Sequence, residues 1–246
     1  MDTIIILIKL IVAHLLGDFI FQTDEMARNK RSPIPSQKFT TLAVHSLVQA
    51  TLSYLLIAQW SNWIIPVIIA VSHFIIDCAK SLTAKDNLKT FIIDQTCHYA
   101  VILALWWVYY IVYQSQVPVS SYIFSLKFWL VATTFIAVLK PTSILLKLFL
   151  ENEKWIPNND TFSGLPNAGK WIGYLERILI LTFIYTGNVM GVGFLLAAKS
   201  IFRFGELNRT KDIKTTEYVL IGTFSSFTIA ILLAFVAQWL HGNACC

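Results

Sequence analysis

Three short segments of the chain each place a histidine and an aspartate four residues apart. They are His14 and Asp18 in "AHLLGDFIFQTD", His73 and Asp77 in "SHFIID", and Asp94 and His98 in "IIDQTCH". In an α-helix this spacing puts both side chains of a pair on one face. Imidazole nitrogens and carboxylate oxygens are ligands that Zn, Mn and Fe take in proteins. The pattern therefore predicts ligands for one or two divalent metal ions on three helices.

Three further polar residues belong to the same pattern. His45 lies in "VHSLVQ", and we expect it to act as a general base or as a further ligand. Gln22 and Gln95 follow Asp18 and Asp94 closely, and we expect them to orient the metal ligands through hydrogen bonds.

The composition indicates which elements must position these residues. Hydrophobic residues make up 56% of the 246 residues and charged residues only 13%, with a mean hydropathy of +0.64. A soluble domain of this length could not bury so much apolar surface. The apolar runs reach the roughly 20 residues that a membrane-spanning helix needs, and they lack the alternation of barrel strands. The sequence therefore predicts an all-α polytopic integral membrane protein.

The apolar runs predict about eight transmembrane helices in two halves. They lie near residues 3–22, 40–59, 64–80, 90–112, 122–146, 170–186, 188–204 and 217–240. The sixth and seventh are short and could form a tight hairpin, or one could enter the membrane without crossing it. We expect residues 1–113 to form a four-helix half with the His/Asp residues and residues 114–246 to form a second four-helix half.

Lysine and arginine alternate between the connections. They gather after the first, third, fifth and seventh runs, whereas "QWSNW", "YQSQVPVSSY" and "TGN" contain neither. By the positive-inside rule, both termini should lie outside and the basic connections in the cytoplasm, as in a bacterial inner membrane. The net charge of +5 is then explained by topology and anionic lipid, and we expect no nucleic-acid partner.

This topology puts the three His/Asp pairs and His45 at similar depth in the cytoplasmic half of the bilayer. Three aspartates and four histidines facing lipid would cost on the order of 10 kcal/mol. These side chains must therefore face one another, water or a metal. The alternative to a metal site is a structural polar network, for example with Asp18 bonded to His73 across two helices.

The second half carries polar residues of another kind. Glu176 and Lys199 lie about equally far from "TGN", which predicts an ion pair across the helical hairpin. We expect Arg177, Lys199 and Arg203 to bind an anionic head group or phosphate. The alternative is that these cations only anchor helix ends at the membrane surface. Cys245 and Cys246 receive no role.

The ordered segments "HLLGDFIFQTDEMARNK", "SHFIIDCAK" and "FIIDQTCH" resemble the bacterial membrane family catalogued as domain of unknown function 3307. "GKWIGYLERILIL" and "AAKSIFRFGEL" also resemble its C-terminal half. The family brings no established activity. In addition, "SHFIID" is similar to an element of predicted membrane-bound metal-dependent hydrolases, and this similarity implies metal-ligand roles for His73 and Asp77 alone.

The sequence leads to a hypothesis of a membrane-embedded metal-dependent hydrolase. Its substrate would be a lipid-linked molecule or lipid head group at the cytoplasmic leaflet, and its cofactor Zn, Mn or Fe. Two alternatives stay open. Buried histidines and aspartates also line the pathways of divalent-metal or proton-coupled transporters, and the protein could be a non-enzymatic membrane protein with a structural metal or polar network.

Overall fold

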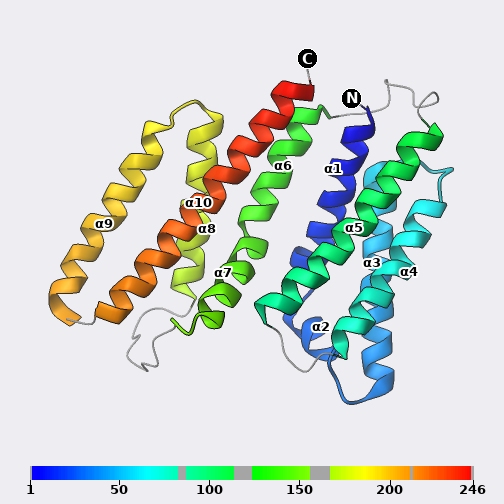
Figure 1. The fold of residues 1–246 in the computed structure, drawn as a ribbon, viewed down its shortest axis with the longest axis horizontal. Coiled ribbons are helices and arrows are strands. Elements are labelled where there is room, and N and C mark those ends of the chain that lie inside the picture. The colour runs from blue at the N-terminus through cyan, green and yellow to red at the C-terminus, as the bar shows by residue number, and fades with distance from the viewer. Residues whose placement is uncertain (1, 83–86, 114–123, 156–166, 211–212, 245–246) are drawn as a thin grey trace. The chain divides into compact units, whose positions relative to one another are not determined.

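The structure, a computed structural model, describes residues 2–82, 87–113, 124–155, 167–210 and 213–244. Within these ranges, side chains are described except at residues 2–3, 112–113, 202–210, 213, 215 and 244. Every regular element of the described chain is a helix (Figure 1). The all-α fold class is therefore confirmed. Cys245, Cys246 and the side chain of Arg203 lie outside the described part.

The elements follow one another as α1 (Asp2–Leu15), the π-helical turn η1 (Leu16–Phe21), α2 (Asp24–Asn29), α3 (Pro35–Ile57), α4 (Ile64–Ser81), α5 (Leu88–Tyr113), α6 (Leu126–Val138), α7 (Lys140–Asn152), α8 (Ala168–Tyr185), α9 (Met190–Thr210) and α10 (Ile213–Ala244). Six helical stretches are long and apolar enough to cross a membrane: Ile4–Phe21, Pro35–Ile57, Ile64–Ser81, Leu88–Ile111, Leu126–Asn152 and Thr216–Asn243. Their number and composition are those of a multi-pass membrane protein.

The count of eight spans is not confirmed. All eight predicted segments contain helix, but α8 and α9 are not among the six stretches found in the described residues. The N-terminal part of α8 carries the charged residues Lys170, Glu176 and Arg177. Charged side chains cost free energy when they are placed in the hydrocarbon of a membrane. In α9, the apolar stretch found among the described residues is Met190–Ile201, which is short of a full span.

The fifth predicted span is interrupted where a single helix was expected. Helix α6 ends at Val138, and Leu139 leaves the helical region with φ −79° and ψ −115° before α7 begins. The second residue of α7 is Pro141, which has no N–H to donate to the Ala137 carbonyl four residues earlier and whose ring would clash with that carbonyl in a continuous helix. The Thr142 hydroxyl donates to the Ala137 carbonyl at 2.7 Å, which satisfies one acceptor left free by the break.

The described chain divides into two compact units, with the division inside α6 between Thr133 and Thr134. We call them unit 1 and unit 2. The division lies beyond the expected boundary at residue 113. In unit 1, α1 and α4 each pack against both α3 and α5, so these four helices close into a bundle (Figure 1). In unit 2, α8 packs against α9 and α10, and α10 also packs against α7.

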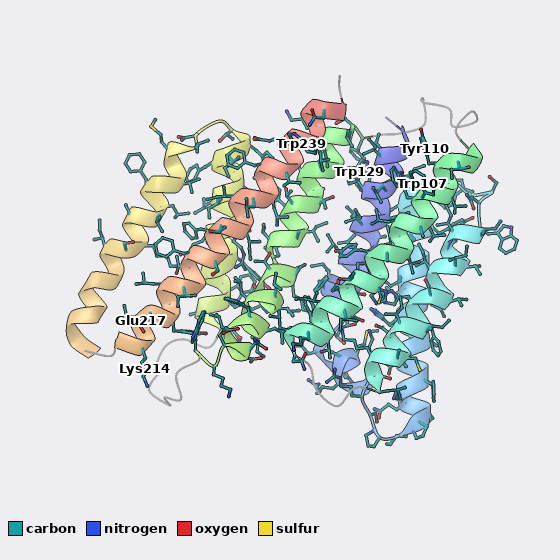
Figure 2. All side chains as sticks on the ribbon, in the orientation of Figure 1. Trp107, Tyr110, Trp129, Lys214, Glu217 and Trp239 are labelled. Atoms are coloured by element: carbon teal, nitrogen blue, oxygen red, sulfur yellow. The ribbon has the colours of Figure 1, made fainter. Side chains whose placement is uncertain are left out.

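One end of the unit 1 bundle is filled by apolar side chains. The buried cluster consists of Ile6, Leu10, Ile57, Ile65, Ile69, Ile102 and Tyr109. These residues come from the first parts of α1 and α4 and the last parts of α3 and α5. Figure 2 shows Trp107, Tyr110 and Trp129 at this same end, as expected for aromatic side chains at a membrane boundary. The opposite end of the bundle is left for polar residues.

Unit 2 has a separate apolar core. It is built from Val138, Ile180, Leu181, Ile184, Val192, Phe227, Ala230 and Ala234. Helix α10 runs through this unit with Lys214 and Glu217 near one end and Trp239 near the other (Figure 2). Its ends therefore have the polarity that an apolar helix shows when it crosses between two membrane surfaces.

Candidate metal centre

The four helices of the unit 1 bundle bring the seven predicted histidines and aspartates together. His14 lies in the last turn of α1 and Asp18 in η1; His45 comes from α3, His73 and Asp77 from α4, and Asp94 and His98 from α5. None of the seven side chains is more than 9% exposed. We call these seven residues the His/Asp cluster.

Asp18 is the most heavily contacted carboxylate of the cluster. Its Oδ1 lies 3.1 Å from His45 Nε2 and 3.3 Å from His73 Nε2. The Gln49 amide donates to the same oxygen at 2.5 Å, and the Gln95 amide donates to Oδ2 at 3.1 Å. Side chains from α3, α4 and α5 therefore meet on a single residue of η1. Asp18 stands at the centre of the bundle's polar end.

The π-helical turn positions Asp18 through a close approach at Gly17. The Gln22 N–H donates to the Gly17 carbonyl at 3.0 Å, so the backbone pairs over five residues. A Cβ at Gly17 would overlap the Gln49 side-chain amide. Gln49 also donates to the His14 carbonyl at 3.3 Å. Glycine is therefore needed at position 17, where the Gln49 side chain of α3 reaches Asp18. π-Helical turns are frequent at functional sites.

Two lysines bind the other two carboxylates. The Lys30 ammonium donates to Asp77 Oδ2 at 2.6 Å and to Gln22 Oε1 at 2.5 Å. The Lys80 ammonium donates to Asp94 Oδ2 at 2.6 Å. The lysine side chains are 13% and 27% exposed, whereas the two aspartates are 5% and 3% exposed. The ammonium groups therefore lie at the edge of the cluster, between the carboxylates and the surface.

The four imidazole rings form a continuous group. His73 and His98 stack with their centroids 4.0 Å apart, His45 lies 4.9 Å from His73, and His14 lies 5.0 Å from His98. His14 Nε2 is 3.2 Å from Gln95 Oε1, so Gln95 contacts both a histidine and Asp18. Three sets of ligand atoms lie within 4.8 Å of one another: His14, His73 and His98; Asp18, His45 and His73; and Asp18, Asp94 and His98.

Several buried atoms of the cluster lack a hydrogen-bond partner among the described residues. They are His45 Nδ1, His73 Nε2, His98 Nε2 and Asp94 Oδ1. Buried polar atoms in native proteins are nearly always satisfied, because an unsatisfied one costs about 1–3 kcal/mol. Imidazole nitrogens and carboxylate oxygens are donors that a divalent transition metal binds directly. The cluster therefore offers donor atoms that could hold a metal ion.

A small cavity adjoins the cluster on the side of the apolar core. It has a volume of about 10 Å³, and its polar lining comes from His14, His73, His98, Gln49, Ser53 and Ser72. Leu10, Ile69 and Ile102 line it as well and belong to the apolar cluster of unit 1. This space accommodates roughly one water molecule. Three of the four imidazoles therefore line a space of about the size of one water molecule.

The family described as "Protein of unknown function (DUF3307)" matches residues 6–127. The chain belongs to this family. The matched DUF3307 segment holds the whole His/Asp cluster, as well as Lys30, Lys80 and Gln49. The C-terminal segments that also resembled the family lie beyond the match. No curated protein and no solved structure matches the chain.

Three residues of the DUF3307 segment contact the cluster although the sequence analysis did not assign them to it. Gln49 lies four residues after His45, so the same helical spacing rule could have found it. Lys30 and Lys80 were interpreted only as markers of cytoplasmic connections, because nothing local distinguishes them from other basic residues. Gln95 contacts two predicted ligands, His14 and Asp18, whereas Gln22 accepts a hydrogen bond from Lys30, which in turn donates to Asp77.

The polar residues of unit 2 lie outside the DUF3307 segment. The predicted ion pair is confirmed, because Lys199 Nζ lies 2.6 Å from Glu176 Oε2. The Arg177 guanidinium is buried and donates to the Ser143 hydroxyl at 2.7 Å and to the Ser226 hydroxyl at 3.0 Å. Lys199 and Arg177 are therefore held by groups of unit 2 itself.

Proposed function

We propose that the protein is a membrane-embedded, metal-dependent hydrolase that acts on a lipid-linked molecule or anionic lipid head group at the cytoplasmic leaflet. The observation that carries this proposal is the group of unsatisfied buried ligand atoms, His73 Nε2, His98 Nε2 and Asp94 Oδ1. The cofactor would be Zn, Mn or Fe, held by ligands from His14, Asp18, His73, Asp77, Asp94 and His98. When bound, such a metal acidifies water and polarises the bond to be cleaved.

His45 is positioned to accept a proton in this reaction. Its Nε2 lies 3.1 Å from Asp18 Oδ1, and its buried Nδ1 has no partner among the described residues. A ring that donates from Nε2 to a carboxylate keeps Nδ1 free to accept a proton. Asp18 would then fix the tautomer and orientation of His45, as the carboxylate does beside other catalytic histidines. We therefore assign His45 as the general base.

The charge balance of the site favours an anionic substrate. Asp18, Asp77 and Asp94 carry three negative charges, and Lys30 and Lys80 compensate two of them. A divalent metal would make the site net positive. Because the two ammonium groups lie at its more exposed edge, an approaching phosphate or carboxylate would meet them first. The interfacial position of a head group suits that edge of a membrane protein.

The proposed topology places this edge at the cytoplasmic surface of a bacterial inner membrane. Lys30 and Lys80 follow the first and third apolar runs, after which the positive-inside rule puts the chain in the cytoplasm. The aromatic residues Trp107, Tyr110 and Trp129 lie at the other end of unit 1 (Figure 2). Both termini would then lie outside, and α8 and α9 would form the sixth and seventh of eight membrane helices.

Metal analysis of the purified full-length chain tests the proposal. Wild-type protein prepared without chelators should hold stoichiometric Zn, Mn or Fe, whereas His73→Ala and Asp94→Ala should lose most of it. The matched control is Lys89→Met, because Lys89 is an exposed residue of α5. Phosphate release from 4-nitrophenyl phosphate and from phosphatidic acid vesicles should then depend on added metal. A wild-type protein without bound metal would refute the proposal.

A cation transporter is the second candidate, favoured by the cavity beside the imidazoles. The lysines lie at one edge of the cluster and the cavity lies on the side of the apolar core. A transported ion would also need a route through Ile6, Ile65 and Tyr109, and polar side chains are scarce there. Uptake of radiolabelled Zn²⁺ or Mn²⁺ into proteoliposomes distinguishes the two functions, because a hydrolase should give no uptake above empty vesicles.

A further inference from the structure

Asp18 directs its two carboxylate oxygens toward different histidines. Oδ1 lies 3.3 Å from His73 Nε2 and 3.1 Å from His45 Nε2. Oδ2 lies 3.7 Å from His14 Nε2. The carboxylate therefore stands between the imidazoles of α3 and α4 on one side and the imidazole of α1 on the other.

Asp77 stands between the histidines of two helices in the same way. Its Oδ2 lies 3.7 Å from His73 Nε2, and its Oδ1 lies 3.6 Å from His98 Nε2. His73 thus faces one oxygen of Asp18 and one oxygen of Asp77. On the other side, His98 faces Asp77 and also Asp94, whose Oδ1 is 3.5 Å away. The carboxylates of Asp18 and Asp77 therefore each face two groups of ligand atoms. One group contains His73, and the other contains His98, Asp94 and His14.

Each of the two groups contains buried atoms that lack a hydrogen-bond partner in the described part of the chain. On the side of α4 this atom is His73 Nε2; on the side of α5 these atoms are His98 Nε2 and Asp94 Oδ1. Around an ion with bonds of about 2.1 Å, neighbouring ligand atoms lie roughly 3–3.5 Å apart. The separations of 3.3–3.7 Å between these donors are close to that range.

We propose that the His/Asp cluster binds two divalent ions bridged by the carboxylates of Asp18 and Asp77. His73 would complete the first position, and His98, Asp94 and His14 would complete the second. This inference rests on the proposed metal-dependent function and adds the number of ions, their separate ligands and the residues that join them. His45 stays beside the first position as the proton acceptor.

A pair of ions at this site, together with the two nearby ammonium groups, favours a phosphate ester as the substrate class. Two metals roughly 3.5–4 Å apart clamp the attacking and leaving oxygens of an in-line displacement at phosphorus. Lys30 and Lys80 stand at the exposed edge of the cluster, one beside a carboxylate of each position. Ammonium groups are suited to the remaining phosphate oxygens. The site would therefore select a phosphorylated lipid over an uncharged ester or amide.

The competing arrangement is a single ion bound by three histidines. Ligand atoms of His14, His73 and His98 also lie within 4.8 Å of one another, and these rings line the cavity. Such an ion would leave Asp94 outside the coordination sphere. The two arrangements therefore differ in the number of ions bound and in the effect of removing the Asp94 carboxylate.

Metal stoichiometry of the full-length protein separates these arrangements. After loading with Mn²⁺ and removal of free metal by gel filtration, wild type should retain two ions per chain and Asp94→Asn should retain one. The control Cys97→Ser changes an exposed residue of the same helix and should keep two. One ion in both wild type and Asp94→Asn overturns the proposal, while no ion in wild type refutes the metal-dependent function itself.

Electron paramagnetic resonance of the wild type provides a test without a variant. Two Mn²⁺ ions joined by carboxylates are magnetically coupled, so the fully loaded protein should lose the hyperfine signal of an isolated ion. The signal should be strongest at substoichiometric loading if the positions fill one after the other. An isolated-ion signal that grows in proportion to bound Mn²⁺ up to saturation overturns the bridged pair. Hydrolysis of 4-nitrophenyl phosphate but not of 4-nitrophenyl acetate supports the substrate class.

Discussion

Units 1 and 2 both bury charged side chains among apolar helices, but they satisfy them differently. In unit 2, Glu176 pairs with Lys199, and the Arg177 guanidinium donates to two serine hydroxyls, while its Nε finds no partner in the described part of the chain. In unit 1, four atoms of the His/Asp cluster have no partner among the described residues, and all four are metal-ligating types. The comparison indicates that unit 2 uses charge to hold its helices together, whereas unit 1 leaves metal-ligating atoms without hydrogen bonds, as the proposed metal site requires.

The largest expected effect in unit 1 comes from Asp18→Asn. The substitution keeps the size of the side chain but removes the negative charge that faces His45 and His73. Metal affinity should fall at least about a hundredfold, because the proposal makes Asp18 a direct metal ligand. Isothermal titration with Zn²⁺ measures this loss. The free energy of unfolding in detergent should also fall by about 1–3 kcal/mol, because the side chains that contact this carboxylate would lose their buried acceptor.

Unchanged metal affinity in Asp18→Asn would contradict the comparison, because the cluster would then be a polar network like that of unit 2. The affinity and the stability must be measured separately. A variant that unfolds more easily but binds metal normally would assign Asp18 a structural role alone.

Two glycines extend the comparison to the backbone. In unit 1, Gly17→Ala would force the Gln49 amide away from Asp18, and we expect a loss of about 1–3 kcal/mol from overpacking. In unit 2, Gly193→Ala meets open space on α9, and we expect a gain of about 0.5–1 kcal/mol from the better helix former. Thermal unfolding of both variants in one detergent checks the opposite signs. A stable Gly17→Ala variant would show that η1 tolerates a displaced Gln49.

The sequence predicted the meeting of the seven residues of the cluster because two simple constraints act together. Spacing of four residues fixes the helix face, and alternating basic connections fix the direction of each helix. His14 and His73, in the second halves of α1 and α4, therefore meet His45 and Asp94, in the first halves of α3 and α5. Neither constraint needs knowledge of packing. Gln49 obeys the same spacing rule and could have been included.

Other features depend on packing and could not be predicted in this way. The π-helical turn exists where Gly17 lets Gln49 approach, and a lone glycine in an apolar run gives no such signal. Lys30 belongs to a connection, and its contact with Asp77 depends on where α2 leads the chain. The break at Leu139 is different, because Pro141 in the sequence could have predicted it.

A smaller effect on metal affinity is expected when Lys80, which contacts the His/Asp cluster, loses its charge. Lys80→Met should raise metal affinity about tenfold. The ammonium group, 2.6 Å from Asp94 Oδ2, competes with a metal ion for the carboxylate and also repels the metal ion. The matched control is Lys89→Met, which removes an exposed lysine of α5 and should leave the affinity unchanged. Competition titration with a Zn²⁺ indicator measures both. Equal affinity in all three proteins would show that Lys80 does not compete with the metal.

The smallest expected effect concerns the Glu176–Lys199 ion pair of unit 2. Glu176→Gln removes the carboxylate charge 2.6 Å from Lys199, whose side chain is 25% exposed, so the pair is neither fully buried nor fully solvated. We expect a loss of about 1 kcal/mol in unfolding free energy, between surface and buried pairs. The double variant with Lys199→Met should recover part of this loss, because it no longer leaves an ammonium group unpaired. Metal content should stay at the wild-type level in both variants. A Glu176→Gln protein that loses metal would mean that the charges of unit 2 serve the site of unit 1, and the division of roles between the two units would be wrong.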